Sequence, residues 1–152
     1  MDTLENAPLT LCSEGLVKRY GKRTVVNNVS FSVRQGEIVG LLGPNGAGKT
    51  TTLKSVVGIL QFDEGEILIN GKSVRTAPLD CKRDIAYIPD NPDLYDFMTG
   101  IKYLNFIADI FKVSVADRQE RIRKYADLFE LTADLAQPIA AYSHGMKQKL
   151  AI

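Results

Sequence analysis

The chain has 152 residues, of which 45% are apolar and 24% are charged, and its formal net charge is +1. This is the composition of a globular protein with enough apolar mass for one core. The near-zero net charge gives no indication of a nucleic-acid surface or of a basic membrane-binding face. The apolar runs are much shorter than the roughly 20 residues of a membrane-spanning helix, so we expect none.

The N-terminus and the cysteines indicate the compartment. Residues 1–6 have neither the basic start nor the apolar centre of a signal peptide. Cys12 and Cys81 have neither CxxC nor metal-ligand spacing, so we expect two reduced thiols. These features favour a cytoplasmic protein.

Residues 9–35 are the first predicted β region. Val29, Phe31 and Val33 alternate with polar residues, which is typical of a half-buried strand. A turn at residues 20–22 separates two such stretches, so we expect an antiparallel β layer.

A glycine-rich loop follows. Residues 37–42 are an apolar run, typical of a strand buried on both faces of a parallel sheet. Residues 43–50 read GPNGAGKT, and residues 51–60 are predicted to be helical. The helix is expected to pack on the sheet through a stripe at i, i+3, i+4 and i+7, formed by Leu53, Val56, Val57 and Leu60.

The loop has the chemistry and the context of a phosphate-binding loop. Its glycines let the backbone approach phosphates closely, its amides form an anion nest, and the helix that follows adds the positive end of its dipole. Lys49 is expected to reach the β- and γ-phosphates and to act in catalysis, and the Thr50 hydroxyl to ligate Mg²⁺. A glycine-rich turn without a ligand is the alternative. The predicted contacts are Gly43, Pro44, Asn45, Gly46, Ala47, Gly48, Lys49, Thr50 and Thr51.

Two more strands are expected before residue 90. Residues 66–69 are predicted to rejoin the antiparallel layer, and Asn70-Gly71 indicates a hairpin. Residues 85–88 are predicted to form a short strand that ends at Pro89.

The remainder of the chain is predicted to be helical. One helix is expected to start after a cap at Thr99 and a second at a capping box formed by residues 117–120. Their apolar stripes are expected to pack in the core; they consist of Leu104, Ile107, Ala108 and Phe111, and of Ile122, Tyr125, Ala126 and Phe129. A last helix begins near Gly145 and shows no stop signal. Because its apolar side would otherwise stay unburied, we expect the chain to be a fragment of a longer one.

These elements predict an α/β fold with three parts. Residues 9–35 and 65–76 make the antiparallel layer. Residues 36–62 and 82–90 make a P-loop NTPase core with a partial parallel sheet, and residues 92–145 make a helical arm. A simple nucleotide kinase or GTPase usually begins almost at the loop and has neither the preceding layer nor this arm.

With this order of elements, residues 9–152 resemble the ATP-binding subunit of an ABC transporter. Tyr20 matches the aromatic residue that stacks on adenine in that family, and stacking suits a base because it needs no particular hydrogen-bond pattern. A surface tyrosine at a β turn is the alternative.

Residues 85–92 look like the segment that joins the core to the helical arm in the family. The family usually has Gln, sometimes Glu, where this chain has Asp90. The resemblance implies a contact between Asp90 and Mg²⁺, direct or through water, because carboxylates suit hard cations. The shorter side chain is a departure, and a turn without a metal contact is the alternative.

Two further segments continue the resemblance. Residues 94–98 match the region that lines the groove for the permease, although they could equally close the core of the arm. Residues 142–146 match the family's signature at Ser143 and Gly145 and depart from it at His144 and Met146. The resemblance implies that Ser143 and Gly145 bind the γ-phosphate held by an opposite subunit, and Ser143 can also cap the helix. His144 has no second ligand near it in sequence and is not predicted to bind a metal.

The resemblance implies an ATPase subunit that binds ATP and Mg²⁺ and powers export through a separate permease, most similar to bacterial drug-export and membrane-export systems. Its partners would be the permease and a second ATP-binding subunit, identical or not, on the inner face of the cell membrane, with no nucleic acid. Alternatives are a soluble ABC-type ATPase outside transport, a nucleotide-binding module without turnover and, least favoured, a P-loop kinase or GTPase. The sequence does not reveal which compound is transported, because in the family the contacts to that compound lie in the permease.

The family places its metal-positioning Asp and catalytic Glu on a strand after the signature helix. We therefore expect residues 1–152, expressed alone, to be poorly soluble or marginally stable and to release no phosphate from ATP above the level of a Lys49→Ala variant. A steady-state phosphate assay checks this. Turnover clearly above that control would show that the expectation is wrong.

Overall fold

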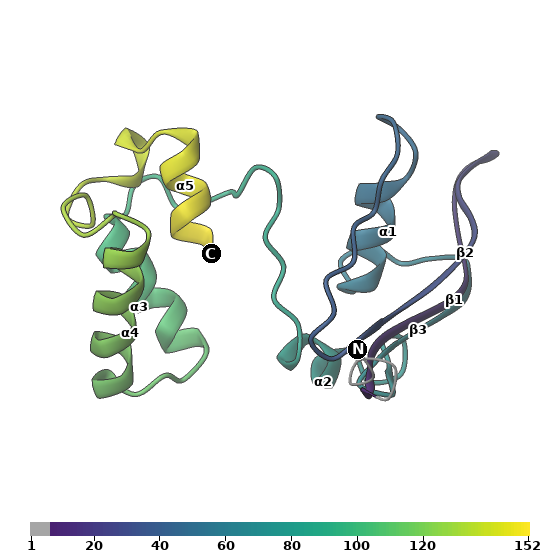
Figure 1. Ribbon diagram of the computed structural model, residues 1–152. Helices are drawn as coiled ribbons and strands as arrows, with labels where there is room; N and C mark the ends of the chain where they lie inside the picture. The colour runs from purple at the N-terminus through teal and green to yellow at the C-terminus, as the bar shows by residue number, and fades with distance from the viewer. Residues whose placement is uncertain (1–6) are drawn as a thin grey trace. The chain divides into compact units, whose positions relative to one another are not determined.

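The computed structural model describes residues 7–152, so the prediction that no signal peptide is present falls on residues outside the described part. The chain divides into two compact units, Met1–Tyr87 and Ile88–Ile152 (Figure 1). Each unit has an apolar core of its own.

The first unit is built on a four-stranded sheet in the order β2-β1-β3-β4, and every pair in it is antiparallel. β1 (Leu9–Tyr20) and β2 (Arg23–Arg34) form a long hairpin, as the turn at residues 20–22 predicts. The pairs Lys18–Val26 and Arg19–Thr24 leave one extra residue in β2 between them, a bulge at Val25. The predicted antiparallel layer is therefore confirmed.

β3 (Glu64–Ile69) returns to pair with β1, and β4 (Lys72–Ser73) completes the sheet. The connection between them is Asn70-Gly71, with φ of 48° and 77°, which confirms the predicted hairpin. Gly65 lies against β1 so closely that a Cβ there would be 2.5 Å from the carbonyl oxygens of Glu14 and Gly15. Glycine is therefore required where β3 begins.

The two strands predicted for a parallel sheet are not formed. All strands of residues 7–152 belong to the antiparallel sheet, and residues 37–42 and 85–88 run as irregular chain in Figure 1. Ile38 is 99% exposed and Leu42 is 95% exposed, whereas the prediction placed them in a core. A parallel strand needs hydrogen-bond partners beside it, and no other described segment pairs with these residues. The prediction of buried parallel strands is therefore wrong for residues 37–42 and 85–88, because an apolar pattern leads to burial only where neighbouring strands are present.

Two helices complete the first unit. α1 (Lys49–Val56) is shorter than the predicted helix and buries Thr52, Ser55 and Val56, while Leu53 of the predicted stripe is 43% exposed. Leu60 lies beyond the helix because Gly58, at φ 70°, reverses the chain. α2 (Pro78–Arg83) has proline at its start and buries Cys81. The core of the unit consists of Leu16, Val26, Val56, Phe62, Ile67, Ile69, Val74 and Cys81.

The second unit consists of α3 (Gly100–Ile110), α4 (Val115–Leu128), the 3₁₀ turn η1 (Ile139–Ala141) and α5 (His144–Ala151). Thr99 caps α3 as predicted, with its hydroxyl accepting from the Lys102 N–H. The predicted start of α4 is wrong by one turn. Ser114 caps the helix, and Asp117 is the acidic partner three residues later, in the manner of a capping box.

The core of the second unit is Leu131, Ile139, Tyr142 and Leu150. The Tyr142 hydroxyl donates to the Asp134 carbonyl oxygen at 2.7 Å. Burial and then the Asp134 carboxylate raise the pKa of the Tyr142 phenol, which keeps it a donor. Leu150 is 5% exposed, so the expectation of an unburied apolar side on α5 is wrong.

Two aromatic residues of the predicted core stripes are on the surface instead. Phe111 is 70% exposed and Tyr125 is 48% exposed, whereas Ala126 is buried. Phe111 is the C-cap of α3 and Tyr125 lies in the last turn of α4, and neither belongs to the core cluster of the unit. Across residues 7–152, no helix is long and apolar enough to span a membrane.

Replacement of Gly65 by Ala is expected to destabilise the first unit strongly. The new Cβ would meet two backbone oxygens, and φ of 92° adds the strain of a left-handed residue, about 1–2 kcal/mol. Gly71→Ala is the matched control, since φ there is 77° and nothing lies within 4 Å of the new Cβ. Urea unfolding should show a clearly larger loss for Gly65→Ala; equal losses would contradict the close packing of β3 on β1.

Candidate functional site

The glycine-rich loop leads directly into α1. Gly48 is the N-cap of the helix in the left-handed conformation, with φ of 90°, and Gly46 is also left-handed, with φ of 83°. No side chain caps the helix, and the first N–H donated back to the loop is that of Thr52, to the Gly48 carbonyl oxygen at 2.8 Å. The earlier N–H groups of α1 have no acceptor within the helix and can serve an anion.

The loop is held against the sheet at Gly48. A Cβ on Gly48 would lie 2.6 Å from the carbonyl oxygen of Val25 and 3.3 Å from a methyl group of Val26. Only a residue without a side chain permits this approach, since real Cβ contacts are longer. The bulge of β2 is thus the surface on which the loop rests, and sequence spacing gives no signal for it.

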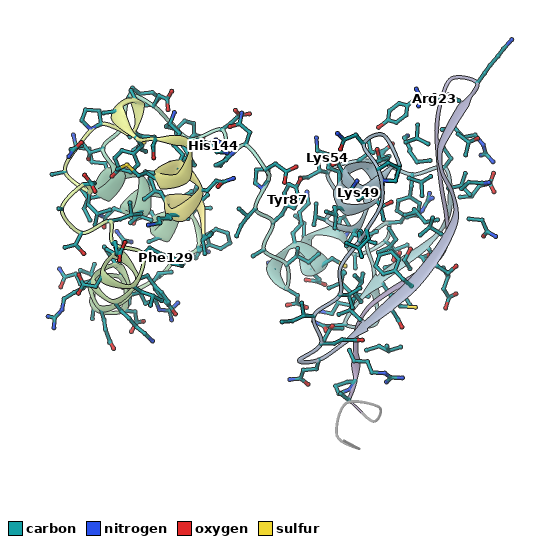
Figure 2. All side chains as sticks on the ribbon, turned by 45° about the horizontal axis from the view of Figure 1, so that its top comes forward. Arg23, Lys49, Lys54, Tyr87, Phe129 and His144 are labelled. Carbon is teal, nitrogen blue, oxygen red and sulfur yellow. The ribbon has the colours of Figure 1, made fainter. Side chains whose placement is uncertain are left out.

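Lys49 folds back over the loop. Its Nζ donates to the carbonyl oxygens of Gly43 at 2.6 Å and Pro44 at 2.9 Å, and Figure 2 shows its side chain on the first turn of α1. An ammonium group has three N–H donors, so one remains available to an anion. The loop therefore concentrates positive charge and N–H donors at the start of α1, as the motif predicts.

The rest of the loop divides into exposed and buried residues. Asn45 and Thr50 are exposed, and the Thr50 hydroxyl lies in the first turn of α1, next to Lys49. On the other side of the helix, Ser55 is buried and its hydroxyl donates to the Thr51 carbonyl oxygen at 2.9 Å. This bond lies within α1, and a contact between Thr51 and a phosphate stays a prediction.

Tyr20 lies at the end of β1, in the same unit as the loop. It pairs with Arg23 across the hairpin and is 52% exposed. The hairpin that carries Tyr20 is the one whose bulge contacts Gly48. The adenine-stacking role of Tyr20 stays a prediction, and its exposed ring is free to meet a base.

The predicted metal ligands lie in different units, Thr50 in the first and Asp90 in the second. Asp90 is exposed, and its carbonyl oxygen accepts from the Gln148 Nε2 at 3.1 Å. Hydroxyl and carboxylate oxygens suit Mg²⁺ chemically, so both residues fit the ion. Residues 7–152 contain no group of three or more His, Cys, Asp or Glu placed to hold a metal. A shared site at Thr50 and Asp90 stays a prediction.

The predicted signature residues lie at the start of α5. Ser143 is the N-cap, with its hydroxyl accepting from the Met146 N–H at 3.2 Å, so the capping role is confirmed. Ser143, His144 and Gly145 are exposed, and a Cβ on Gly145 would find nothing within 4 Å. Figure 2 places His144 at the first turn of this helix. Binding of a phosphate here stays a prediction.

α5 is also tied to the segment after Asp90, in a way that sequence reasoning missed. Lys147 Nζ lies 2.7 Å from Asp96 Oδ1, and the Ala140 N–H donates to the Asp96 carbonyl oxygen at 3.1 Å. The partners are about fifty positions apart in the chain, so no local pattern reveals them. They hold residues 90–98 against the start of α5.

Exposed aromatic residues follow in the same segment. The Tyr95 ring packs against Phe97, Tyr103 and Phe106, with centroids 5.6–6.2 Å apart. Phe97 is 86% exposed, whereas Leu94 and Met98 pack on the core. Leu94 and Met98 therefore help to close the core of the arm, which is one of the two roles that the sequence left open. A contact between residues 94–98 and a permease stays a prediction.

Gly48→Ala is expected to displace the start of α1, because the new Cβ would meet the Val25 backbone. ATP affinity, measured by isothermal titration calorimetry, should fall at least about tenfold, or 1.4 kcal/mol. Gly58→Ala is the control: it has the same kind of strain at φ 70°, and the nearest atom is the end of the Lys82 side chain at 3.9 Å. It should keep the affinity; unchanged binding by Gly48→Ala would refute the role of the contact.

Comparison with known proteins extends over most of the chain. The family described as "ABC transporter" matches residues 26–152. The Bacillus subtilis protein named "Uncharacterized ABC transporter ATP-binding protein YhcH" is 36% identical over 139 residues, which cover 91% of this chain and 45% of that protein. The "Linearmycin resistance ATP-binding protein LnrL" of the same organism is 33% identical over 142 residues, which cover 93% of this chain and 46% of that protein.

A solved structure is also similar to this chain. It is described as an ATP-binding subunit of an ABC transporter and is 36% identical, with a TM-score of 0.85, over 93% of this chain and 59% of that one. The chain spans about half the length of the curated relatives it matches. It belongs to the ABC transporter family, with the α/β fold of that family's ATP-binding subunits.

Proposed function

We propose that this chain is the nucleotide-binding part of an ABC transporter ATPase that drives export through a separate permease. The observation that carries the proposal is the loop at residues 43–51, where Gly48 rests on β2 and Lys49 lies over the loop with an N–H to spare. Membership in the family and the naming of its relatives as ATP-binding proteins support ATP as the ligand.

The phosphates would lie at the start of α1. The N–H groups of the loop and of the first turn would donate to them, and the Lys49 ammonium would neutralise part of the charge on the β- and γ-phosphates. The adenine base would stack on Tyr20, whose ring is half exposed in the same unit. Mg²⁺ would be held by Thr50, and by Asp90 directly or through water, and when bound it would offset phosphate charge.

A second ATP-binding subunit would complete the site. Ser143 and Gly145 stand exposed at the N-terminus of α5, where the backbone N–H groups favour an anion. We propose that they contact the γ-phosphate held by the opposite subunit. Lys49, the loop N–H groups and Mg²⁺ would then stabilise charge on the transferred phosphoryl group. We propose that ATP hydrolysis is an activity of the whole protein, because in the family the metal-positioning Asp and the catalytic Glu come after the signature helix.

We propose that the protein lies at the cytoplasmic face of the membrane, where it is bound to a permease. One relative is named for linearmycin resistance and another for Nod factor export, and the second name supports the direction proposed here. The exposed aromatic residues of the 94–98 segment are the proposed permease contact. A soluble ABC-type ATPase outside transport is the second candidate; a neighbouring reading frame for a six-helix membrane protein would favour transport, and its absence the alternative.

Lys49→Ala tests the ATP site. Loss of a charge-assisted hydrogen bond costs about 1.5–3 kcal/mol, so ATP affinity should fall roughly tenfold to a hundredfold and phosphate release by the whole protein should stop. Lys54→Ala removes the same charge from the last turn of the same helix and should change neither (Figure 2). Calorimetry and a phosphate assay measure both effects. If the two variants bind ATP equally well, the proposed site is wrong.

A further inference from the structure

Lys18 lies beside Tyr20 and has no place in the predicted site. Its Nζ is 5.2 Å from the centroid of the Tyr20 ring. Residues two apart in a strand project from the same face, which brings the two side chains together on β1. The Lys18 side chain is only 14% exposed, although lysine ammonium groups usually reach into water.

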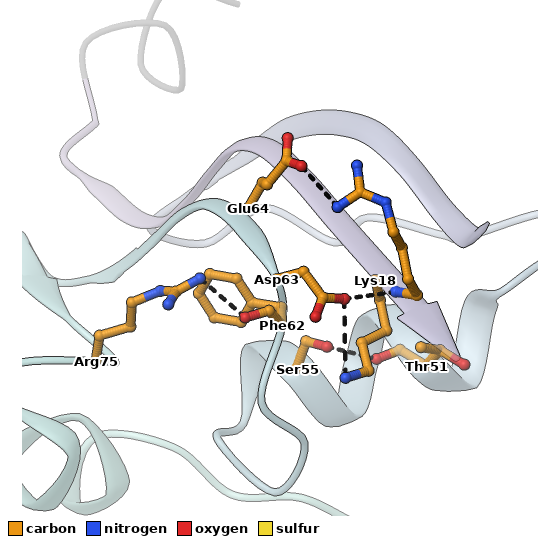
Figure 3. A network of polar contacts seen from close by, with 8 residues as sticks. Lys18, Thr51, Ser55, Phe62, Asp63, Glu64 and Arg75 are labelled. Carbon is orange, nitrogen blue, oxygen red and sulfur yellow. Dashed lines mark hydrogen bonds and ion pairs between the residues drawn. The ribbon is translucent and has the colours of Figure 1, made fainter. Parts of the chain in front are cut away.

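The ammonium is held from its other side by Asp63, in the turn between α1 and β3. Lys18 Nζ lies 3.9 Å from Asp63 Oδ2, and the same oxygen accepts from the Arg19 N–H at 2.6 Å (Figure 3). The Asp63 N–H donates to the Val17 carbonyl oxygen at 2.9 Å. Asp63 is therefore fixed against the end of β1 by backbone contacts, and its carboxylate anchors Lys18 electrostatically, at ion-pair distance.

A neighbouring ion pair strengthens the anchor. Arg19 lies 2.6 Å from the Glu64 carboxylate, directly after Asp63. As Figure 3 shows, these contacts join the end of β1 to the turn where β3 begins. The turn follows α1, which starts at the phosphate-binding loop. The position of Tyr20 is thus linked through a short, hydrogen-bonded stretch of chain to the helix that carries the loop.

We propose that Lys18 is a positioning residue for the base of the bound nucleotide, acting through Tyr20. The ammonium, held by Asp63, attracts the Tyr20 ring by a cation–π contact and fixes the orientation in which the ring meets the base. The proposal rests on the proposed stacking of adenine on Tyr20. A half-exposed ring on a hairpin end would otherwise lose rotational freedom on binding, and ordering it beforehand lowers that cost.

Two other roles for Lys18 give different results in experiment. If the Lys18 ion pair only stabilised the fold, replacement of Lys18 would lower the unfolding temperature and leave the affinity for ATP unchanged. If Lys18 attracted the phosphates directly, its replacement would weaken the binding of every polyphosphate ligand, whether or not Tyr20 is present. If Lys18 acts through Tyr20, its replacement should weaken binding only when the Tyr20 ring is present and the ligand carries a base.

The test uses Lys18→Met, which keeps most of the apolar stem and removes the charge, in the purified protein at its natural length. Binding of Mg-ATP and of Mg-tripolyphosphate is measured by calorimetry, with circular dichroism to follow folding. Ordering one side chain costs about 0.5–1.5 kcal/mol, so ATP affinity should fall between about twofold and twelvefold. Tripolyphosphate affinity should stay the same, and Lys18→Arg should restore ATP binding, because guanidinium also stacks on aromatic rings.

A double-mutant cycle with Tyr20→Ala makes the test decisive. In the Tyr20→Ala background, Lys18→Met should change ATP affinity less than twofold. Lys72→Met, which removes a charge from the edge strand β4, two strands away from β1, is the control and should leave ATP affinity unchanged. Additive effects of Lys18→Met and Tyr20→Ala would overturn the proposal, and so would a full ATP affinity for Lys18→Met.

The design separates this inference from the proposed function. If Lys49→Ala abolishes ATP binding and Tyr20→Ala weakens it, but Lys18→Met has no effect, the ATP site stands and the role of Lys18 is refuted. If Tyr20→Ala leaves ATP affinity unchanged, the base does not stack on Tyr20, and the role of Lys18 falls with it. If Lys18→Met unfolds the protein, Asp63→Asn releases the anchor while keeping an acceptor for the Arg19 N–H, and unchanged ATP binding by that variant refutes the proposal.

Discussion

The contact between Gly48 and the Val25 carbonyl oxygen is the constraint on which the first unit depends. It requires glycine at the N-cap of α1, so no side chain satisfies the first N–H groups of the helix. The same contact sets the loop on the bulge of β2, and β2 forms a hairpin with the strand that ends in Tyr20. One steric requirement thus creates an open anion site and links it to the residue proposed to receive the base.

The parts of the fold that the sequence could predict are those set by neighbouring residues. The turns at residues 20–22 and 70–71, the caps at Thr99 and Ser143 and the start of α1 at the glycine-rich loop each depend on a few adjacent side chains. The start of α4 was missed because two acceptors, Ser114 and Asp117, lie in one turn, and the earlier of them caps the helix.

What the sequence could not predict depends on whether partners distant in the chain are present. The 37–42 and 85–88 segments read as strands, yet a strand forms only where a neighbour supplies hydrogen bonds. In the site, the motif identified the loop itself, while the Val25 contact, the Asp63 anchor and the Lys147–Asp96 ion pair join residues far apart in the chain. Such contacts come from tertiary packing, and no spacing rule encodes them.

The exposure of residues 37–42 has a consequence for how the protein is made. An extended apolar stretch with free N–H and C=O groups is a template for pairing with other chains. Ile38 and Leu42 are almost fully exposed when residues 7–152 are folded. The folded first unit therefore presents an exposed apolar segment beside its antiparallel sheet. Chaperones that bind extended apolar peptides should recognise this segment during synthesis.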